Sequence, residues 1–372
     1  MSPSLPYPEG GAAAREAGPR EWADRLWDAV LAQDETAARD TVIAAAESVG
    51  TESALLDVIG AVQRRVGTEW AADRISVAQE HAATTINDRS VSALVRHPRA
   101  QPPPGPRAGH VTVACVDGEW HGLPARLLTE VLRLRGWEVD HLGTLVPPPR
   151  LVAHLHRTGP AAVALSGSLA TRLPAAHATI AACRAAGVPV FAGGPAFGRD
   201  GRYARMLGAD AWAPDARSAA DRLAAGPLPR PRPGDEPADD LPHLRDQEFT
   251  LVARSAPQLV KAVVTGLTEL LPALRAYTEW QLQQTAQDIA HVVEFLGAAL
   301  YVDDAELFTG FMGWTTDILT ARHVPANVLL PTLDLLGAEL GDFPRATRLI
   351  RQGARELTDR TAPDPPAPEA HR

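Results

Sequence analysis

Short apolar runs alternate with amphipathic segments of helical length between residues 109 and 225. In chain order they are Val111–Val116, Pro124–Arg135, Glu138–Leu142, Pro148–His156, Ala162–Ser166, Pro174–Ala186 and Pro189–Gly193, followed by a weaker final pair. This alternation predicts a doubly wound α/β fold with a parallel sheet, a Rossmann-like domain over residues 109–226. Ligands of such folds bind outside the carboxyl ends of the strands, at the switch point of strand order. His121, Ser166 and Gly193-Gly194 all fall at that edge.

Two proline-rich stretches, residues 101–106 and 227–237, flank this region and are predicted to be semi-rigid linkers. Residues 21–98 carry apolar groups at helical spacing, which predicts a four-helix bundle. Gly50 is expected to end its second helix, and the capping box Ser76-Val77-Ala78-Gln79 to open its fourth. Residues 1–20 and 361–372 are predicted to be disordered tails.

Residues 246–360 return to helical spacing and predict an all-α domain. Its candidate helices lie near Ala256–Leu274, Tyr277–Tyr301, Ala305–Thr320 and Ala326–Leu340. The chain is therefore expected to have three domains, two helical and one α/β.

The composition limits the classes of partner. The net charge is -9 and no basic cluster occurs, whereas a nucleic-acid surface needs concentrated Lys and Arg. Only two cysteines are present, Cys115 and Cys183, which excludes a disulfide framework and a cysteine-based zinc site and fits a reducing cytoplasm. No secretory signal opens the sequence, and no run approaches the roughly 18 apolar residues of a membrane span. We expect a cytoplasmic protein without direct nucleic-acid or membrane binding.

One histidine stands where the first strand hands over to a helix, in Gly118-Glu119-Trp120-His121-Gly122. A lone histidine at such a place is more often an ordinary loop residue than a ligand. Glu119 favours the second interpretation, because a neighbouring carboxylate orients a metal-ligating imidazole. Ser166 and Gly193-Gly194 are small and leave room for a flat or elongated ligand group. No Gly-x-Gly-x-x-Gly or Walker pattern occurs, which argues against a dinucleotide or a nucleoside triphosphate.

This arrangement resembles the cobalamin-binding domain family, whose pattern is Asp-x-His-x-x-Gly, then a serine motif, then Gly-Gly. The resemblance implies that His121 is the lower ligand of cobalt and that Glu119 is its orienting partner. Glu119 in place of Asp, and Pro124 in place of the last Gly, look like the version found in light-sensing cobalamin proteins. The residues implied to form the channel for the nucleotide tail of the cofactor are Ser166, Leu169, Gly193 and Gly194.

The helical region before the sheet is expected to distinguish methyl carriers, mutase subunits and light sensors. Trp70 is followed, after nine residues, by Glu80-His81. Taken singly, these are a core tryptophan and a solvated helix start. Together they resemble the signature of adenosylcobalamin-dependent photoreceptors, in which the indole lies over the upper face of the cofactor and the Glu-His pair contacts the adenosyl group. The transcriptional photoreceptors have a histidine after the tryptophan, where Ala71 stands here, so His81 is the hypothesised substitute.

The stretch Thr285-Ala286-Gln287-Asp288-Ile289-Ala290-His291 lies inside a long predicted helix. An exposed carboxylate and a partly buried histidine are its plain explanation. It also resembles the Cys-x-x-Asp-Ile helix of phycobilisome-type proteins, which binds a linear tetrapyrrole. In that resemblance Asp288 accepts hydrogen bonds from pyrrole nitrogens, and Thr285 replaces the cysteine. No cysteine occurs in residues 246–360, so a bilin would be held non-covalently.

Aromatic residues are concentrated in this region, and at helical spacing they form either a core or a cofactor site. They are Trp280, Phe295, Tyr301, Phe308, Phe311 and Trp314, with Lys261, Arg275 and Arg322 as candidate partners of propionates. A globin-like haem site with His291 or His323 as iron ligand is the competing interpretation.

A cobalamin domain, the photoreceptor bundle and a phycobilisome-like domain together resemble the photocobilin family, which combines adenosylcobalamin and biliverdin in one light sensor. The resemblance implies a signalling photoreceptor that is not an enzyme. Light would cleave the cobalt–carbon bond and change the bundle or the oligomeric state, with a homodimer as one form and an unknown protein downstream. A corrinoid methyl carrier for a methyltransferase and a cobalamin plus haem sensor are the alternatives.

Overall fold

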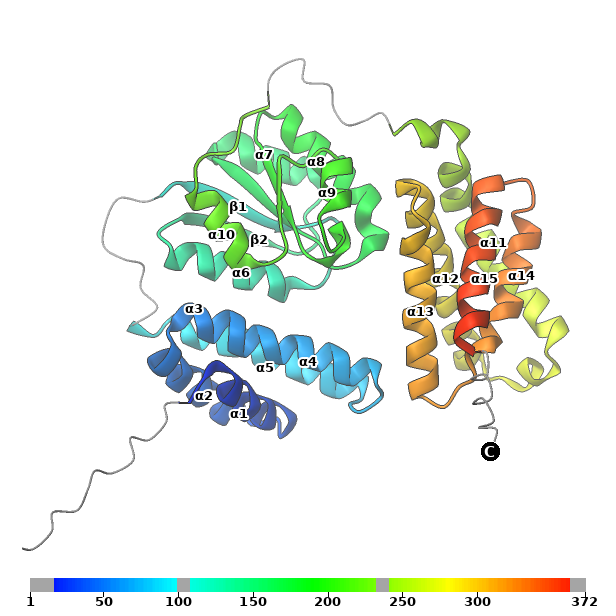
Figure 1. Cartoon of the computed structure of the whole chain (residues 1–372), viewed down its shortest axis with the longest axis horizontal. Coiled ribbons are helices and arrows are strands. Elements are labelled where there is room, and N and C mark those ends of the chain that lie inside the picture. Colours follow the sequence, from blue (N-terminus) through cyan, green and yellow to red (C-terminus); the bar gives the residue numbers. More distant parts are fainter. Residues whose placement is uncertain (1–16, 99–107, 232–240, 362–372) are drawn as a thin grey trace, which may run out of the picture. The chain divides into compact units, whose positions relative to one another are not determined.

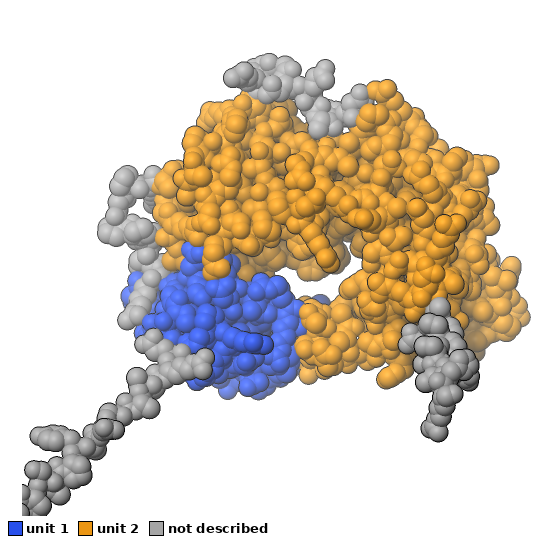
Figure 2. Space-filling view, in the orientation of Figure 1, with its two compact units in different colours: residues 1–66, 81–101 blue, residues 67–80, 102–372 orange. Residues whose placement is uncertain are grey.

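The computed structural model describes residues 17–98, 108–231 and 241–361 (Figure 1). The chain divides into two compact units, residues 1–66 with 81–101 and residues 67–80 with 102–372, which Figure 2 colours separately. The second unit therefore holds the sheet, the C-terminal helices and the turn at residues 67–80. The predicted tails at 1–16 and 362–372, the first proline-rich stretch and residues 232–237 of the second lie outside the described residues.

The N-terminal region is helical. Its helix α1 begins at Pro19, so residues 19–20, assigned to a tail, are helical instead; the fixed φ of proline suits a first helical position. Gly50, with φ 85°, follows α2, and Ser76 and Gln79 exchange the hydrogen bonds of a capping box, so both predicted boundaries are confirmed. The elements are α1 (Pro19–Leu31), α2 (Glu35–Val49), α3 (Thr51–Ser53), η1 (Ala54–Ile59), α4 (Gly60–Ala71) and α5 (Val77–Leu94).

The third predicted helix of this region is a continuous run of α3, η1 and α4 with a π-helical middle. Apolar spacing does not reveal such a segment, because a π turn changes the hydrogen-bond pattern without removing the apolar face. Leu55 and Ile59 of this segment are fully buried, together with Leu26 and Val42 from α1 and α2. These side chains form the core of the first unit.

The sheet has five parallel strands in the order β2-β1-β3-β4-β5. The direction of strand addition reverses between β1 and β3, which is the switch point of a doubly wound fold. Cys115 pairs with Ser166, and Ser166 pairs with Gly193, so the carboxyl ends of the three central strands are level. The strands are β1 (His110–Cys115), β2 (Glu138–Gly143), β3 (Ala162–Ser166), β4 (Val190–Gly193) and β5 (Ala211–Ala213).

Helices cover both faces of this sheet (Figure 1). Helix α6 (Gly122–Leu134) packs beside α10 (Ala216–Ala224), and α7 (Pro148–Thr158) packs beside α8 (Leu173–Ala185). Residues of β3 are buried along the whole strand, as expected of a parallel strand that is covered on both faces. The predicted α/β architecture is thus present. The short elements η3 (Ala170–Arg172), η4 (Pro195–Phe197) and α9 (Arg202–Met206) follow the ends of β3 and β4.

Residues 242–361 are helical. They form η5 (Pro242–Asp246), α11 (Glu248–Leu270), η6 (Pro272–Ala276), α12 (Glu279–Val302), α13 (Ala305–Ala321), η7 (Ala326–Leu329), α14 (Leu330–Glu339) and α15 (Pro344–Thr361). Helix α11 begins earlier than predicted and contains Pro257. Helix α15 was not predicted, because its buried Ala346, Leu349 and Leu357 form a narrow apolar stripe within an arginine-rich sequence. Within the described residues, no helix is long and apolar enough to cross a membrane.

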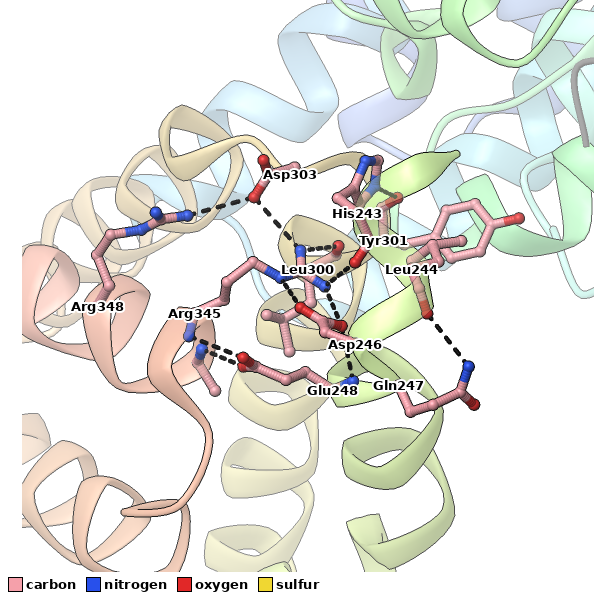
Figure 3. A network of polar contacts seen from close by, with 11 residues as sticks. His243, Leu244, Asp246, Gln247, Glu248, Leu300, Tyr301, Asp303, Arg345 and Arg348 are labelled. Carbon is pink, nitrogen blue, oxygen red and sulfur yellow. Dashed lines mark hydrogen bonds and ion pairs between the residues drawn. The ribbon is translucent and has the colours of Figure 1, made fainter. Parts of the chain in front are cut away.

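Arg345 joins the start of α15 to the segment that enters the C-terminal helices (Figure 3). Its guanidinium donates to the carbonyl oxygens of Leu300 at 2.9 Å and His243 at 3.1 Å. The buried carboxylate of Glu248 accepts from the backbone N–H groups of Arg345 at 3.0 Å and Ala346 at 2.8 Å. Glu248 thereby satisfies backbone donors that the first turn of α15 leaves unpaired.

The sheet and the C-terminal helices share one hydrophobic core, which runs from Leu173 and Ile180 of α8 to Val292 and Leu296 of α12. Polar contacts border it. The imidazole of His177 and the hydroxyl of Tyr301 are 2.7 Å apart, and the hydroxyl of Tyr203 donates to Asp304 at 2.9 Å. The sheet and the C-terminal helices therefore pack against each other.

Candidate functional site

His121 lies between β1 and α6, at the level of the central strand ends, as its position in the sequence predicts. Both its backbone N–H and its Nδ1 reach Oε1 of Glu119, at 2.9 Å and 2.6 Å. Glu119 is fully buried, whereas the His121 side chain is 43% exposed. The carboxylate therefore fixes one edge of the imidazole and leaves the other edge open.

This contact determines which ring nitrogen carries the proton. An ionised carboxylate only accepts hydrogen bonds, so Nδ1 of His121 must donate to it. The neutral ring then has its lone pair on Nε2, on the edge that Glu119 does not contact. An imidazole in this form is a metal ligand, with a carboxylate orienting it from behind.

The second oxygen of Glu119 holds the loop after β3. Oε2 accepts from the backbone N–H groups of Ser168 at 2.7 Å and Leu169 at 3.0 Å. Burial alone would raise the pKa of Glu119, but the hydrogen bonds from His121, Ser168 and Leu169 lower it to about 2. One carboxylate thus joins the histidine loop to the loop of the expected tail channel.

The tail-channel residues predicted from the sequence lie at one edge. Ser166 ends β3 and is buried, and Gly193 ends β4 beside it. Gly194 has φ 100°, and a Cβ there would lie 2.3 Å from the carbonyl oxygen of Gly167. Only glycine permits this close approach of the two strand ends.

Two residues at this edge escaped the sequence analysis. Arg172 packs against Gly118, where a Cβ would meet its Cδ at 3.4 Å, and its Nε is buried without a hydrogen-bond partner among the described residues. Its position three residues after Leu169 is the signal that could have found it. Cys115 is buried, and burial and the charge of Glu119 raise the pKa of its thiol to about 12. Cys115 is therefore a neutral core residue.

The side chains at this edge suit a metal whose other ligands come from a cofactor and not from the protein. In the described part of the chain, no group of three or more His, Cys, Asp or Glu side chains is placed to hold a metal ion. A protein-built zinc site needs three or four such ligands. A single open imidazole instead suits one axial position of a metal already held in a macrocycle.

Trp70 lies in the last turn of α4, and Glu80 and His81 lie in the first turns of α5. The Trp70 ring is 6.3 Å from that of Trp314, and the guanidinium of Arg322 lies 5.2 Å from its centroid. Trp70, half-buried, contacts both of these residues of the C-terminal helices. The structure records no ring contact between Trp70 and His121 within the described residues.

The residues predicted for the second chromophore are partly brought together. Asp288 and His291 are exposed on α12; partial desolvation raises the pKa of Asp288, and the charges of His291 and Arg322 oppose this rise. The hydroxyl of Thr285 donates to the carbonyl of Gln281 within α12. His323 is exposed, at φ 58°, after the end of α13.

Several of the aromatic residues considered for this site are core residues. Phe308 is fully buried, and Phe311 is nearly so and stacks on Phe295 with a 3.8 Å centroid separation. Trp280 and Trp314 are 67% and 48% exposed. The core interpretation therefore holds for the phenylalanines, whereas Trp280 is largely exposed and Trp314 is half-exposed beside Trp70.

Comparison with protein families gives two matches, both described as B12 binding domain. One covers residues 109–224, the α/β region, and the other covers residues 22–94, the N-terminal helices. Together they support cobalamin binding by this chain. Comparison with curated protein sequences gives no match.

Three solved structures are similar in part. The monomethylamine corrinoid protein of Methanosarcina barkeri is 20% identical, with 56% of this chain and 99% of that chain covered and a TM-score of 0.47. The methanol:cobalamin methyltransferase complex of the same organism is 19% identical (59% and 88% covered, TM-score 0.31). A cobalamin-binding protein from Desulfitobacterium hafniense is 21% identical (54% and 96% covered, TM-score 0.31). Likenesses at these scores support no conclusion about activity.

Proposed function

We propose that this protein is a light sensor and not an enzyme. It binds adenosylcobalamin with His121 as the lower ligand, and it holds biliverdin non-covalently among the C-terminal helices. Light changes its conformation or its oligomeric state, and a downstream protein partner receives the change. The globin-like or phycobilisome-like character of the C-terminal helices is part of this proposal.

The observation that carries the proposal is a pairing within one chain. A histidine with its Nε2 open, held by Glu119, suits one axial position of cobalt. A helical segment that matches a B12 binding domain presents Trp70 and, at the start of the next helix, Glu80-His81. A methyl carrier needs the first feature, whereas the second fits a cap over a bulky upper group.

Each residue then has a definite task. His121 binds from below, and Glu119 keeps its Nδ1 protonated and its ring oriented. Trp70 supplies a flat apolar face, and Glu80 and His81 supply polar contacts for a nucleoside. When bound, adenosylcobalamin supplies a cobalt–carbon bond that visible light cleaves. A helical region packed on the bound nucleoside would have to rearrange when that contact is lost, and that rearrangement would be the signal.

The second chromophore is proposed to lie beside Asp288, whose carboxylate is exposed on α12. Among the described residues no hydrogen bond to Asp288 is recorded, and partial desolvation raises its pKa. Donors such as pyrrole N–H groups would satisfy it. Arg322 is the nearby cation for a propionate, and the exposed indole of Trp314 offers a stacking surface.

The cobalamin part is tested by absorption spectroscopy on full-length protein loaded in the dark. Adenosylcobalamin bands that change under green light support the proposal, and unchanged bands contradict it. His121→Ala should lose the axial-ligand signature of the spectrum. His156→Ala, which removes an exposed histidine of the same α/β region, is the matched control and should retain it.

The bilin part needs a separate titration with biliverdin. A red-shifted absorption band that is lost in Asp288→Asn and retained in Asp334→Asn, an exposed aspartate of α14, supports it. A Soret band and bound iron would favour the haem sensor instead. Methyl transfer that survives darkness and Trp70→Ala would favour the corrinoid carrier.

A further inference from the structure

Trp70 is contacted by residues from the far end of the sequence. The turn at residues 67–80 belongs to the same compact unit as the C-terminal helices. The guanidinium carbon of Arg322 lies 5.2 Å from the Trp70 ring centroid, within the range of a cation–π contact. The Trp314 ring lies 6.3 Å away at a 37° tilt. Arg322 and Trp314, both from α13 or its cap, therefore bracket this indole.

Arg322 is itself held in place. It caps α13, and the hydrogen bonds from His323 to Thr320 at 3.0 Å and from Val324 to Leu319 at 2.8 Å close the helix as a Schellman motif. Its Nε lies 3.5 Å from Oδ1 of Asp73, three residues after Trp70. The helix end thus orders the backbone at Arg322, and Asp73, on the segment that carries the tryptophan, pairs with its guanidinium.

We propose that Arg322 is a positioning residue, which holds the Trp70 indole in the orientation that caps the upper face of the cobalamin. The role of this orientation toward the cofactor rests on the proposed function. The positioning itself is a property of the protein alone. A planar guanidinium suits this task because it stacks on the ring and keeps a free edge for Asp73. The orientation of the Trp70 indole therefore depends on Arg322 at the C-terminal end of α13.

The test uses full-length protein without cofactor. The eight tryptophans are replaced by 5-fluorotryptophan, and the Trp70 fluorine resonance is assigned with Trp70→Phe. Exposed cation–π contacts are weak. Arg322→Gln should therefore lower the population of the Trp70 conformation that lies between residue 322 and Trp314 about two- to fivefold, and it should shift the fluorine resonance. Arg348→Gln is the matched control, because Arg348 also pairs with an aspartate, Asp303, at 3.3 Å.

Two further variants separate stacking from the ion pair. Arg322→Lys keeps the charge and part of the ring contact and should restore part of the resonance position. Asp73→Asn should shift it less than Arg322→Gln does. An unchanged Trp70 resonance in Arg322→Gln, or an equal shift in Arg348→Gln, overturns the inference.

A second arm keeps this result distinct from the proposed function. With adenosylcobalamin bound in the dark, Arg322→Gln should alter the rate of spectral change under green light, and Arg348→Gln should not. If the fluorine shift occurs and no light response exists even in the wild type, the positioning stands and the sensor proposal fails. If the wild type responds and Arg322→Gln leaves both resonance and rate unchanged, the positioning role fails alone.

Discussion

Glu119 and Asp288 are both carboxylates followed closely by a histidine, yet their surroundings move their pKa in opposite directions. Glu119 is buried, and four N–H donors surround it: the backbone and Nδ1 of His121 and the backbones of Ser168 and Leu169. Its pKa falls to about 2. Asp288 is exposed, and partial desolvation raises its pKa although His291 and Arg322 are near.

The protein itself provides the hydrogen-bond donors around Glu119 but provides none to Asp288 among the described residues. The protein itself satisfies the charge of Glu119, so the histidine beside it is ordered before any ligand arrives. The carboxylate of Asp288 is exposed, so a donor from outside the chain can reach it in exchange for water. The sheet edge is preorganised, whereas the carboxylate on the C-terminal helices is open to solvent.

The largest expected difference in stability is between the two variants that truncate these carboxylates. Glu119→Ala leaves three partly buried backbone N–H groups without an acceptor and should lower the free energy of unfolding by about 3 kcal/mol. Asp288→Ala should cause no loss and a small gain, because it removes a charge that is partly desolvated. Denaturant unfolding of both variants measures this. Equal losses in the two variants would break the comparison.

The two carboxylates should also differ in their response to pH. The pKa of Glu119 is lowered, so its ionisation stabilises the folded state above pH 4.5, and that contribution is lost as the pH falls from 4.5 towards about 2. Wild type should therefore lose roughly 3 kcal/mol relative to Glu119→Gln across this window. Asp288 should give the opposite slope, because its raised pKa makes ionisation unfavourable in the folded state. Denaturant unfolding curves at several pH values measure the sign of the stability change with pH for each carboxylate.

Gly194 supports the Glu119 hydrogen bonds indirectly, because it packs against the loop whose backbone N–H groups donate to Glu119. In Gly194→Ala the new Cβ meets the carbonyl of Gly167, next to Ser168, at φ 100°. We expect a loss of about 2 to 3 kcal/mol in the free energy of unfolding. Gly136→Ala is the control, since φ is 86° there and no heavy atom lies within 4 Å. It should lose only about 1 kcal/mol, and equal losses would exclude the close approach as the cause.

The smallest expected change in stability concerns His323, which follows Arg322 at the end of α13. It occupies the left-handed position after α13, at φ 58°, where glycine is preferred. His323→Gly should raise the free energy of unfolding by up to about 1 kcal/mol. If biliverdin binding, measured by titration, is unchanged in this variant, His323 takes no part in the site. A loss of bound iron would instead support the haem interpretation.

The sheet edge could be predicted from the sequence because parallel strands end at a common edge. His121, Ser166 and Gly193-Gly194 each follow or end a central strand, so their convergence needs only the strand order. The link from Glu119 to Ser168 and Leu169 could not be predicted, because it depends on the path of a loop. Arg172 was missed for the same reason.

The C-terminal helices show the limit of such reasoning. Helical spacing places Phe295, Phe308 and Phe311 on inner faces but does not say whether a core or a ligand fills the space. The structure fills it with the rings themselves. The contact between Arg322 and Trp70 joins residues 252 positions apart, and nothing in either local pattern indicates it.

The core that the sheet shares with the C-terminal helices has a consequence for folding. Because Leu173 and Ile180 pack in one cluster with Val292 and Leu296, neither side can open without exposing apolar surface of the other. Amide hydrogens of α8 and α12 should therefore exchange with solvent deuterium as one cooperative group. If the chain were cut between α8 and α12, each fragment would expose an apolar surface that is complementary to the other, and the two fragments should associate.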